Sequence, residues 1–562
     1  MAGSYYNPSV EAGEAASDSA EKKAQSVTEV HVSHVSRPLL LVFYIGSHHN
    51  LLTRPLDSTF LNHSALITVF ITNYLAVIPA SFFVQAFEPW GVDISSLWML
   101  GAYLIGYVAF ILPTMRFSEM FGRLPTFWLG LVVFVIFTGV AGNAKTSYTF
   151  DVLRGLQGVG AGIMSSIVVH FVATNASDRS RSLFVAGLCA AQLFGVGAAH
   201  IIGGKLALDG KFRWAVYLAA PIAAAPAILC TPALLSDKRP PRTESLLQSV
   251  LRYDYVGTLL LFGAVLMLTI GTVFGGNEHK WSSAIVICLI VFGGVAAAAF
   301  LLWEKYGAKR PIFNAAWLHE HNLQVCVVNI LFMSMVFFAH SVYVPILYIT
   351  ARRLDTAEAG KKTAPYWGVS MGAALIAGFV LRFRSRLARP VVWAGLVVGI
   401  VFSGLYYTIP AETTSESKER AYFALAGFGM GLSFTAISYL AQISVPLEEA
   451  GSAAVVGHFL SIVGGMLGLI LYQACLKSRL IINMDPVFKS DTFLSSFDVR
   501  TMDITALEMA GASLEKYASN MLPLIGEKLA DSLHTTFILS VPFLGFALLM
   551  TVLYKHRNNP SH

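Results

Sequence analysis

The sequence predicts an all-α protein with many membrane-spanning helices, and its composition gives the first reason. Of the 562 residues, 55% are hydrophobic and 13% are charged, whereas an ordinary soluble domain has roughly 25% charged residues. The second reason is the long apolar runs, because Tyr255–Phe274, Ile285–Trp303 and Val391–Ile409 contain no Lys, Arg, Asp or Glu. About 20 such residues cross the hydrocarbon core as a helix. Transmembrane barrels show a period-2 alternation that is absent here, so the spans are helices.

About fourteen apolar runs lie between clusters of turn-forming and charged residues. We predict spans near 65–86, 96–115, 125–142, 150–174, 182–203, 213–235, 254–275, 283–303, 324–349, 366–384, 390–409, 421–444, 452–475 and 534–554. An even number of spans places both ends of the chain on one side of the membrane. Loops rich in Lys and Arg alternate with poorer ones, and the positive-inside rule makes both termini cytoplasmic. Four basic residues oppose this orientation: Arg352, Arg353, Lys361 and Lys362.

Four segments lie outside these spans. Residues 1–38 are rich in Ser, Ala, Glu and Lys, which is typical of a disordered tail, here a cytoplasmic one. Residues 39–64 are too short in apolar content for a full span and predict an irregular or amphipathic approach to the membrane. Residues 477–532 predict a long outside loop, amphipathic in part, and residues 555–562 a cytoplasmic C-terminal tail.

Composition and motifs exclude several function classes. The net charge of +6 is spread over short loops, which fits membrane topology and not nucleic-acid binding. All five cysteines fall in apolar stretches without CxxC spacing, so we expect no metal site. There is no HExxH pair, no GxSxG elbow and no phosphate-binding loop with its Lys. We therefore expect no catalytic residues and no enzyme.

The fourth predicted span contains the most informative motif. It has Arg154 and Gln157 followed by Gly158, Gly160 and Gly162, and it resembles the fourth-helix motif of the major facilitator superfamily. The glycines predict close helix packing, and an arginine inside the membrane is costly unless it has a partner or a task.

Asp151 precedes Arg154 by three residues on the same helix face, so the two side chains are placed to pair. This is either a structural ion pair or, as the resemblance implies, a proton-coupling or gating group, with Gln157 beside it.

The segment between the second and third predicted spans is similar to the superfamily's cytoplasmic loop motif. Glu119, Gly122 and Arg123 match its acid, its turn glycine and its basic residue, whereas Met115 replaces its first glycine. A carboxylate facing an arginine across a tight turn forms a cytoplasmic gate between helix bundles or a weak surface pair.

The fifth predicted span resembles the antiporter motif of the same superfamily. Gly203 and Gly204 match the terminal glycine pair that packs this helix, but His200 stands where a proline is expected to bend it. Together with the span count, this makes the chain similar to the fourteen-helix drug:proton antiporter branch.

The resemblance implies a division of the spans. It places an N-terminal six-helix bundle at 65–235, two linker helices at 236–303 and a C-terminal six-helix bundle at 304–554 that includes the outside loop. Internal repeats of this kind predict that the twelfth span repeats the fourth. If Gly429 and Gly431 match Gly158 and Gly160, then Leu425 corresponds to Arg154.

The first predicted span lacks the membrane-embedded acid that the family often has, and Asn73 occupies that place. If protons drive transport, the carrier is either Asp151 with Arg154 or a histidine, since imidazole titrates near pH 6.5. The candidate histidines are His170, His200, His340 and His458. Polar side chains inside spans should face the interior. We therefore predict a substrate cavity that includes Gln192, Asn329, His340, Tyr343, Gln442 and His458.

The function that follows is secondary active export of a small organic molecule, such as a drug, toxin or secondary metabolite, by alternating access. The resemblance implies a proton gradient as the energy source and no cofactor. The expected partners are the small-molecule substrate and the lipid bilayer, with no nucleic acid, for a monomer in the plasma membrane or, alternatively, the vacuolar membrane. Uptake of a siderophore or nutrient, or a sensor without transport, are the other interpretations.

Overall fold

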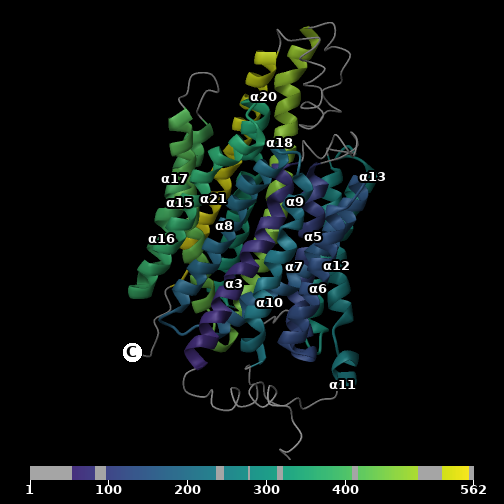
Figure 1. Cartoon of the computed structure of the whole chain (residues 1–562), viewed down its shortest axis with the longest axis vertical. Helices are drawn as coiled ribbons and strands as arrows, with labels where there is room; N and C mark the ends of the chain where they lie inside the picture. The colour runs from purple at the N-terminus through teal and green to yellow at the C-terminus, as the bar shows by residue number, and fades with distance from the viewer. Residues whose placement is uncertain are drawn as a thin grey trace, which may run out of the picture. The chain divides into compact units, whose positions relative to one another are not determined.

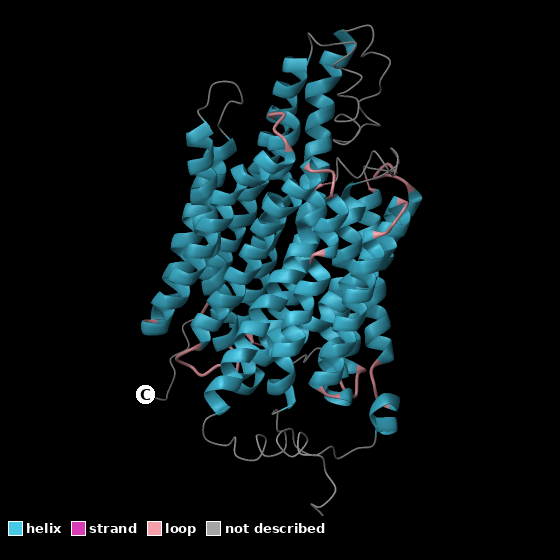
Figure 2. Ribbon diagram, viewed as in Figure 1, coloured by secondary structure: helices cyan, strands magenta, loops and turns pink. Residues whose placement is uncertain are grey.

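The computed structural model describes residues 53–82, 96–235, 246–275, 279–312, 320–407, 416–490 and 522–555. Residues Phe60–His562 form one compact unit, which contains every contact described below. Figure 2 shows that the described chain is helical, with short loops between the helices. The predicted tail at 1–38 lies outside the described residues, and so does the one at 555–562 apart from Lys555.

The N-terminal helices and the pair that follows them have these bounds: α3 (Thr53–Val77), η1 (Ile78–Ser81), α5 (Ser96–Phe121), α6 (Arg123–Gly142), α7 (Ser147–Asn175), α8 (Arg181–Leu208), α9 (Phe212–Tyr217), α10 (Ala219–Leu235), α11 (Leu246–Leu251), α12 (Tyr255–Phe274) and α13 (Ala284–Tyr306). The C-terminal helices are α14 (His321–Ile346), η3 (Leu347–Ala351), α15 (Thr356–Phe383), η4 (Ser385–Leu387), α16 (Ala388–Tyr407), α17 (Glu416–Ile443), η5 (Leu447–Glu449), α18 (Ala450–Ser490), α20 (Leu522–Thr536), η8 (Phe537–Leu539) and α21 (Ser540–Val552). Figure 1 labels most of them along the chain.

Thirteen helices in the described part of the chain are long and apolar enough to cross a membrane. The prediction of many membrane-spanning helices is therefore confirmed, with one difference. The predicted span at 213–235 is divided at Leu218 into the short α9 and the 17-residue α10. The segment Ala219–Leu235 alone is a little shorter than the roughly 20 residues that an untilted crossing needs.

The predicted outside loop at 477–532 is helical at both of its ends, and residues 491–521 lie outside the described residues. α18 continues without interruption to Ser490, and α20 already begins at Leu522. The two helices pack against each other and extend together beyond their neighbours (Figure 1). The polar residues that suggested a loop are accommodated in a long helix, as in Asn483, whose Nδ2 donates to Ser532 Oγ at 2.9 Å. Of the approach predicted at 39–64, residues 39–52 lie outside the described residues, and the remainder belongs to α3, which begins at Thr53.

Glycines bring α7 against both α5 and α6. A Cβ added at Gly158 or Gly162 would overlap the carbonyl oxygen of Tyr103 or Tyr107 on α5. A Cβ at Gly160 would lie 2.5 Å from the backbone nitrogen of Phe134 on α6. Small residues permit such backbone approach between membrane helices. The close helix packing predicted for these three glycines is therefore confirmed.

The glycine pair of α8 contacts two different elements. A Cβ on Gly203 would lie 2.6 Å from Ile78 Cδ1 in η1, and one on Gly204 would overlap the carbonyl oxygen of Thr356 at the start of α15. Thr356 Oγ1 also donates to the Gly204 carbonyl at 2.8 Å. His200, one turn earlier, is buried and lies 3.1 Å from Ser81 Oγ through Nδ1. This turn of α8 therefore joins the N-terminal helices to α15.

The contact between α8 and α15 continues to the other end of both helices. A Cβ on Gly360 would overlap the carbonyl oxygen of His200, and one on Gly378 would overlap Ala186. Gly197 lies under the side chain of Trp367, whose Cβ would be 2.9 Å from an added Cβ. α8 and α15 thus form an uninterrupted interface between the N-terminal and C-terminal helices.

The pair α12 and α13 is held by a capping carboxylate. Asp254 Oδ1 accepts from the backbone nitrogen of Gly257 at 2.9 Å, which caps the start of α12. The same oxygen accepts from Trp303 Nε1 at 2.8 Å and so ties the end of α13 to the start of α12. Tyr253 stacks on Phe117 of α5, with ring centroids 5.0 Å apart. The pair is thereby attached to the N-terminal helices.

Candidate functional site

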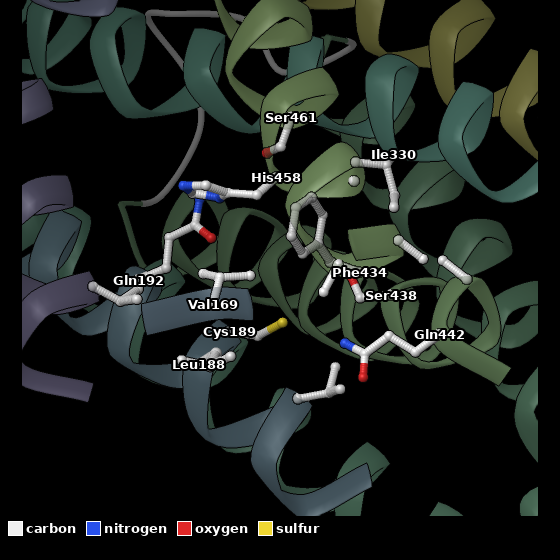
Figure 3. A pocket seen from close by; sticks show the side chains of 16 residues that line it. Val169, Leu188, Cys189, Gln192, Ile330, Phe434, Ser438, Gln442, His458 and Ser461 are labelled. Carbon is white, nitrogen blue, oxygen red and sulfur yellow. The ribbon is translucent and has the colours of Figure 1, made fainter. Parts of the chain in front are cut away.

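A cavity lies between the N-terminal and C-terminal helices, and it is the candidate substrate site. Val69 of α3, Val169 of α7 and four residues of α8 form one side. Ile330 of α14 and residues of α17 and α18 form the other, and Figure 3 shows their side chains surrounding the cavity. The lining residues are Val69, Val169, Val185, Leu188, Cys189, Gln192, Ile330, Phe434, Ser438, Ala441, Gln442, Ala453, Ala454, Gly457, His458 and Ser461.

The lining contains no Asp, Glu, Lys or Arg in the part of the chain that the structure describes. Its two amides, Gln192 on α8 and Gln442 on α17, lie on different sides of the cavity (Figure 3). Gln192 Nε2 and Gln442 Oε1 are buried and have no hydrogen-bond partner among the residues that the structure describes. A buried polar atom without a partner is costly, so a ligand with matching polar groups would be stabilised here.

His458 also lines the cavity, and it is joined to the N-terminal helices. Its Nε2 lies 3.0 Å from the hydroxyl of Tyr107 on α5, and the two rings meet edge to face with centroids 5.6 Å apart. The Tyr107 hydroxyl in turn donates to Ser165 Oγ on α7 at 2.7 Å. Ser165 Oγ donates to Thr72 Oγ1 on α3 at 3.3 Å. Polar groups from four helices therefore meet beside the cavity.

Arg154 lies away from the cavity and binds carbonyl groups. It is fully buried, and its Nη2 donates to the Leu75 carbonyl at 2.7 Å while Nε donates to the Met99 carbonyl at 3.1 Å. The last carbonyls of a helix lack partners within it and carry partial negative charge. Leu75 lies in the final turn of α3, so Arg154 caps this helix. Its guanidinium carbon also lies 4.3 Å from the ring centroid of Tyr103.

Gln157 extends this group toward α6. Its Oε1 accepts from Arg154 Nη1 at 2.8 Å, and its Nε2 donates to Thr138 Oγ1 at 2.6 Å. The Arg154 side chain and its neighbour thus connect α3, α5, α6 and α7 through hydrogen bonds.

The predicted pair of Asp151 and Arg154 is not formed. No ion pair joins them among the described residues, and Asp151 Oδ1 is buried without a hydrogen-bond partner. The reason is geometric, because the guanidinium is already satisfied by the carbonyls of α3 and α5. Asn73 does not bond to Arg154 either. Its Nδ2 donates to the Val69 carbonyl at 2.8 Å, and its Oδ1 has no partner.

The loop motif has a different arrangement from the predicted one. Glu119 Oε2 pairs with Arg116 Nη1 at 2.6 Å, one turn earlier on α5, and no described contact joins it to Arg123. The guanidinium of Arg123 lies 5.2 Å from the ring centroid of Phe171. Gly122 has φ of 101°, a backbone conformation that favours glycine, so its role as the turn residue is as predicted. Arg116 Nε reaches the Pro311 carbonyl, beyond α13, at 2.9 Å.

Three of the six residues predicted for the cavity line it: Gln192, Gln442 and His458. The others are buried elsewhere. His340 Nε2 lies 2.9 Å from Ser540 Oγ, and Tyr343 donates to the Leu469 carbonyl at 2.9 Å. Asn329 Nδ2 donates to its own helix at Val325. Polarity predicts that such side chains avoid lipid, but it does not distinguish a cavity from a helix interface.

The packing contacts correct the register of the internal repeat. A Cβ on Gly427 would lie 2.7 Å from the Tyr366 carbonyl oxygen, and one on Gly431 would overlap that of Ser370, both on α15. Gly429 instead faces Gly395 and Gly399 on α16. Gly158 and Gly162 make the equivalent contacts with α5, and Gly160 makes the equivalent contact with α6.

In this register Tyr366 corresponds to Tyr103, and Phe423 corresponds to Arg154. The predicted match of Leu425 with Arg154 is therefore wrong by two residues. The rings of Phe423 and Tyr366 stack with centroids 4.2 Å apart, in the place where Arg154 lies over Tyr103. The second half uses an aromatic pair where the first half uses a charge.

Tyr107, Ser165 and Thr72 were not predicted as site residues. Single hydroxyls are common in membrane helices and give little signal by themselves. Tyr103, Gly106 and Tyr107 on one helix did offer one, because two tyrosines four residues apart beside a glycine share a face that packs closely. A Cβ on Gly106 would overlap the Gly155 carbonyl of α7.

A comparison with known families gives the identity of this arrangement. The family model described as Major Facilitator Superfamily matches residues 64–318 and, in a second match, 255–469. The chain belongs to the major facilitator superfamily. It is a multi-pass membrane transporter and not an enzyme, and the motif around Arg154 that suggested this superfamily is confirmed as a family resemblance.

Named relatives in the superfamily are distant in sequence. The chain is 24% identical over 509 residues to the MFS-type efflux pump LUC4 of a Fusarium species, covering 86% of both chains. It is 22% identical to the multidrug transporter protein MdtP of Bacillus subtilis, over 82% of this chain and 86% of the relative. It is 24% identical to the MFS-type transporter TOXA of Cochliobolus carbonum, over 77% and 79%.

Solved structures share the fold. The bacterial homologue of the human lysosomal transporter Spinster, in an inward-facing and occupied conformation, matches with a TM-score of 0.55 at 14% identity. It covers 89% of this chain and 96% of its own. The proton:xylose symporter XylE matches with a TM-score of 0.51 at 13% identity, over 88% and 94%. The all-α transporter fold predicted from the sequence is thereby confirmed.

Proposed function

We propose that this transporter exports a small, uncharged and largely apolar organic molecule in exchange for protons. The observation that carries the proposal is the lining of the cavity, which is apolar apart from two amides, two serines, a cysteine and His458. An ionic substrate would be desolvated there without an opposite charge to compensate it. An uncharged molecule with one or two polar groups would lose little free energy on leaving water. Its polar groups could bond to the buried amide atoms of Gln192 and Gln442, which lack partners among the described residues.

Export is the direction that the relatives support. The names printed for LUC4 and MdtP are those of an efflux pump and a multidrug transporter. Gly203 and Gly204, which resemble the antiporter motif, pack against η1 and α15. The distribution of Lys and Arg in the loops supports an orientation with both termini in the cytoplasm, and we propose the plasma membrane as the location because export requires it.

The transport cycle is alternating access around the cavity. The N-terminal and C-terminal helices contribute separate sides of it, so a change in their mutual tilt exposes it to one aqueous phase at a time. The interface of α8 and α15 is the natural axis, since backbone contacts at Gly204, Gly360 and Gly378 leave no room for sliding. Contacts of α18 with α5 and α7 are the ones that open.

The test uses purified protein in liposomes with radiolabelled chloramphenicol as the uncharged probe and ethidium as the cationic one. We expect chloramphenicol to be taken up against its gradient when the lumen is made acidic, and ethidium to be transported several-fold less well. The matched control is an Ala298→Trp variant, which alters an exposed residue of α13 outside the cavity. Accumulation of chloramphenicol only when the outside is acidic would indicate symport, as in uptake. Preference for ethidium would contradict the substrate class.

A further inference from the structure

The hydroxyl groups beside the cavity form a chain whose direction fixes the tautomer of His458. Thr72 donates its hydrogen to the Thr68 carbonyl at 2.9 Å, and Ser165 donates to Thr72 at 3.3 Å. Tyr107 donates to Ser165 at 2.7 Å. A hydroxyl has a single hydrogen to donate, so Tyr107 has none left for the imidazole. Nε2 of His458, 3.0 Å from the Tyr107 hydroxyl, therefore carries a hydrogen and donates it.

This assignment makes Nδ1 the basic nitrogen of His458. In a neutral imidazole one ring nitrogen is a donor and the other is an acceptor. No described residue is hydrogen-bonded to Nδ1. Figure 3 shows the imidazole and the amide of Gln192 pointing toward each other in the cavity. A proton that enters the cavity can bind Nδ1 while Nε2 keeps its hydrogen and its bond to Tyr107.

Within the described part of the chain, the surroundings of His458 contain no charged side chain that would compete for this proton. The titratable groups facing it are Tyr107 of α5 and Cys189 of α8, and His170 of α7 lies two turns away, beside Gly451. The groups that α3, α14 and α17 contribute to the cavity are Val69, Ile330, Phe434, Ser438, Ala441 and Gln442, all uncharged.

Because no counter-charge is present, protonated His458 requires water in the cavity. An apolar substrate displaces that water. The proton and the substrate therefore exclude each other energetically, without contacting the same atom.

We propose that His458 is the proton-binding residue of this transporter, protonated at Nδ1 when the cavity holds water and neutral when it holds the substrate. This inference rests on the proposed proton-coupled export and names the group that performs it. The proton comes from cavity water and returns to water on the other side of the membrane. The Nδ1–H bond is the bond that forms and breaks.

Protonation also acts on the contact between the two sets of helices. A positive imidazole turns the Nε2–H bond to Tyr107 into a charge-assisted one, which is roughly twice as strong as a neutral hydrogen bond. Tyr107 belongs to α5 and His458 to α18. Protonated His458 therefore holds α5 and α18 together, and loss of the proton releases them.

The tautomer is tested directly by nitrogen NMR of protein labelled with ¹⁵N-histidine in liposomes. Subtracting the spectrum of an H458Q variant isolates the two nitrogens of His458. At high pH we expect a protonated Nε2 and a bare Nδ1, and on acidification Nδ1 gains its hydrogen while Nε2 is unchanged. A bare Nε2 at high pH would overturn the assignment. A Y107F variant should shift the Nε2 signal and leave Nδ1 titrating.

The coupling is tested with the pH dye pyranine inside the same liposomes. When chloramphenicol is added outside, the wild type should release luminal protons, and the H458Q variant should release none per chloramphenicol taken up. An H279Q variant, altered in the turn before α13, should keep the wild-type ratio. A wild-type ratio in H458Q would overturn the proposal.

Failure of the proposed function and failure of the His458 assignment give different results in these experiments. If wild type transports chloramphenicol and moves no protons, coupling fails in the proposed function itself. If wild type transports neither, the substrate class fails, and the NMR titration still decides His458.

Amide hydrogen exchange tests whether protonation of His458 strengthens the contact between α5 and α18. After correction for intrinsic exchange, backbone amides of α5 near Tyr107 should exchange more slowly at low pH than at high pH. The difference should vanish in both H458Q and Y107F. Faster exchange at low pH would mean that Tyr107 donates to Nε2, and it would overturn the proposal.

Discussion

Nη2 of Arg154 donates to the carbonyl oxygen of Leu75 across 2.7 Å, so a charged residue of α7 closes the C-terminal turn of α3. The guanidinium is held by helix carbonyls and lies over the ring of Tyr103, and among the described residues it forms no ion pair with the carboxylate one turn away. This explains how Asn73 can stand in α3 where an acid was expected. The helix end itself supplies the negative partial charge.

Arg154→Ala should destabilise the protein strongly. The change removes hydrogen bonds to the Leu75 and Met99 carbonyls and leaves both buried, which costs on the order of 3 kcal/mol. We expect a clear decrease in the thermal unfolding temperature in detergent, followed by size-exclusion chromatography after heating. Arg179→Ala, at an exposed position, is the control and should be neutral. Normal stability of Arg154→Ala with an altered pH profile would instead favour the coupling role.

Gly158→Ala should force α5 and α7 apart. Its added Cβ would overlap the Tyr103 carbonyl oxygen, which is backbone and cannot rotate away. Overpacking of this kind costs about 1–3 kcal/mol. Gly139→Ala on α6 is a matched change, because nothing lies within 4 Å of its added Cβ. The same thermal assay should rank Gly158→Ala well below Gly139→Ala, and equal stability would contradict the close packing.

Ala454→Trp should block transport while leaving the fold intact. Ala454 lines the cavity, and an indole there occupies space that the substrate needs. We expect chloramphenicol uptake to fall at least tenfold with an unfolding temperature near that of the wild type. Ala298→Trp on α13 adds the same bulk outside the cavity and should transport normally. Undiminished transport by Ala454→Trp would place the substrate path elsewhere.

The sequence predicted the helices well because lipid imposes a minimum apolar length that is visible residue by residue. It also predicted the glycine contacts of α7, since small residues at such spacing have few other uses. The partner of Arg154 was not predictable, because backbone carbonyls are the same in every residue. In the sequence Asp151 was the nearest acid, whereas in the structure Arg154 donates to the backbone carbonyl of Leu75.

Only three of the six polar residues predicted for the cavity line it, and the reason is related. Gln192, Gln442 and His458 line it, whereas His340 and Tyr343 bond to neighbouring helices. Both groups are polar and buried, and only the three-dimensional tilt of the helices separates them. Similarly, Phe423 occupies the place of Arg154 in packing without repeating its chemistry. The correct register was nevertheless visible in the sequence, because Gly427, Gly429 and Gly431 repeat the spacing of Gly158, Gly160 and Gly162.

The corrected register of the repeat predicts very different losses of stability at two nearby positions of α17. Phe423 is 2% exposed and stacks on Tyr366, whereas Leu425 is 39% exposed. Phe423→Ala should therefore cost about 3–5 kcal/mol through lost packing and a cavity, and Leu425→Ala should cost well under 1 kcal/mol because its side chain faces lipid or solvent. Heating in detergent followed by size-exclusion chromatography measures both. If Leu425→Ala proved the more damaging change, the contacts that pair Phe423 with Arg154 would not describe the folded protein, and the original register would be restored.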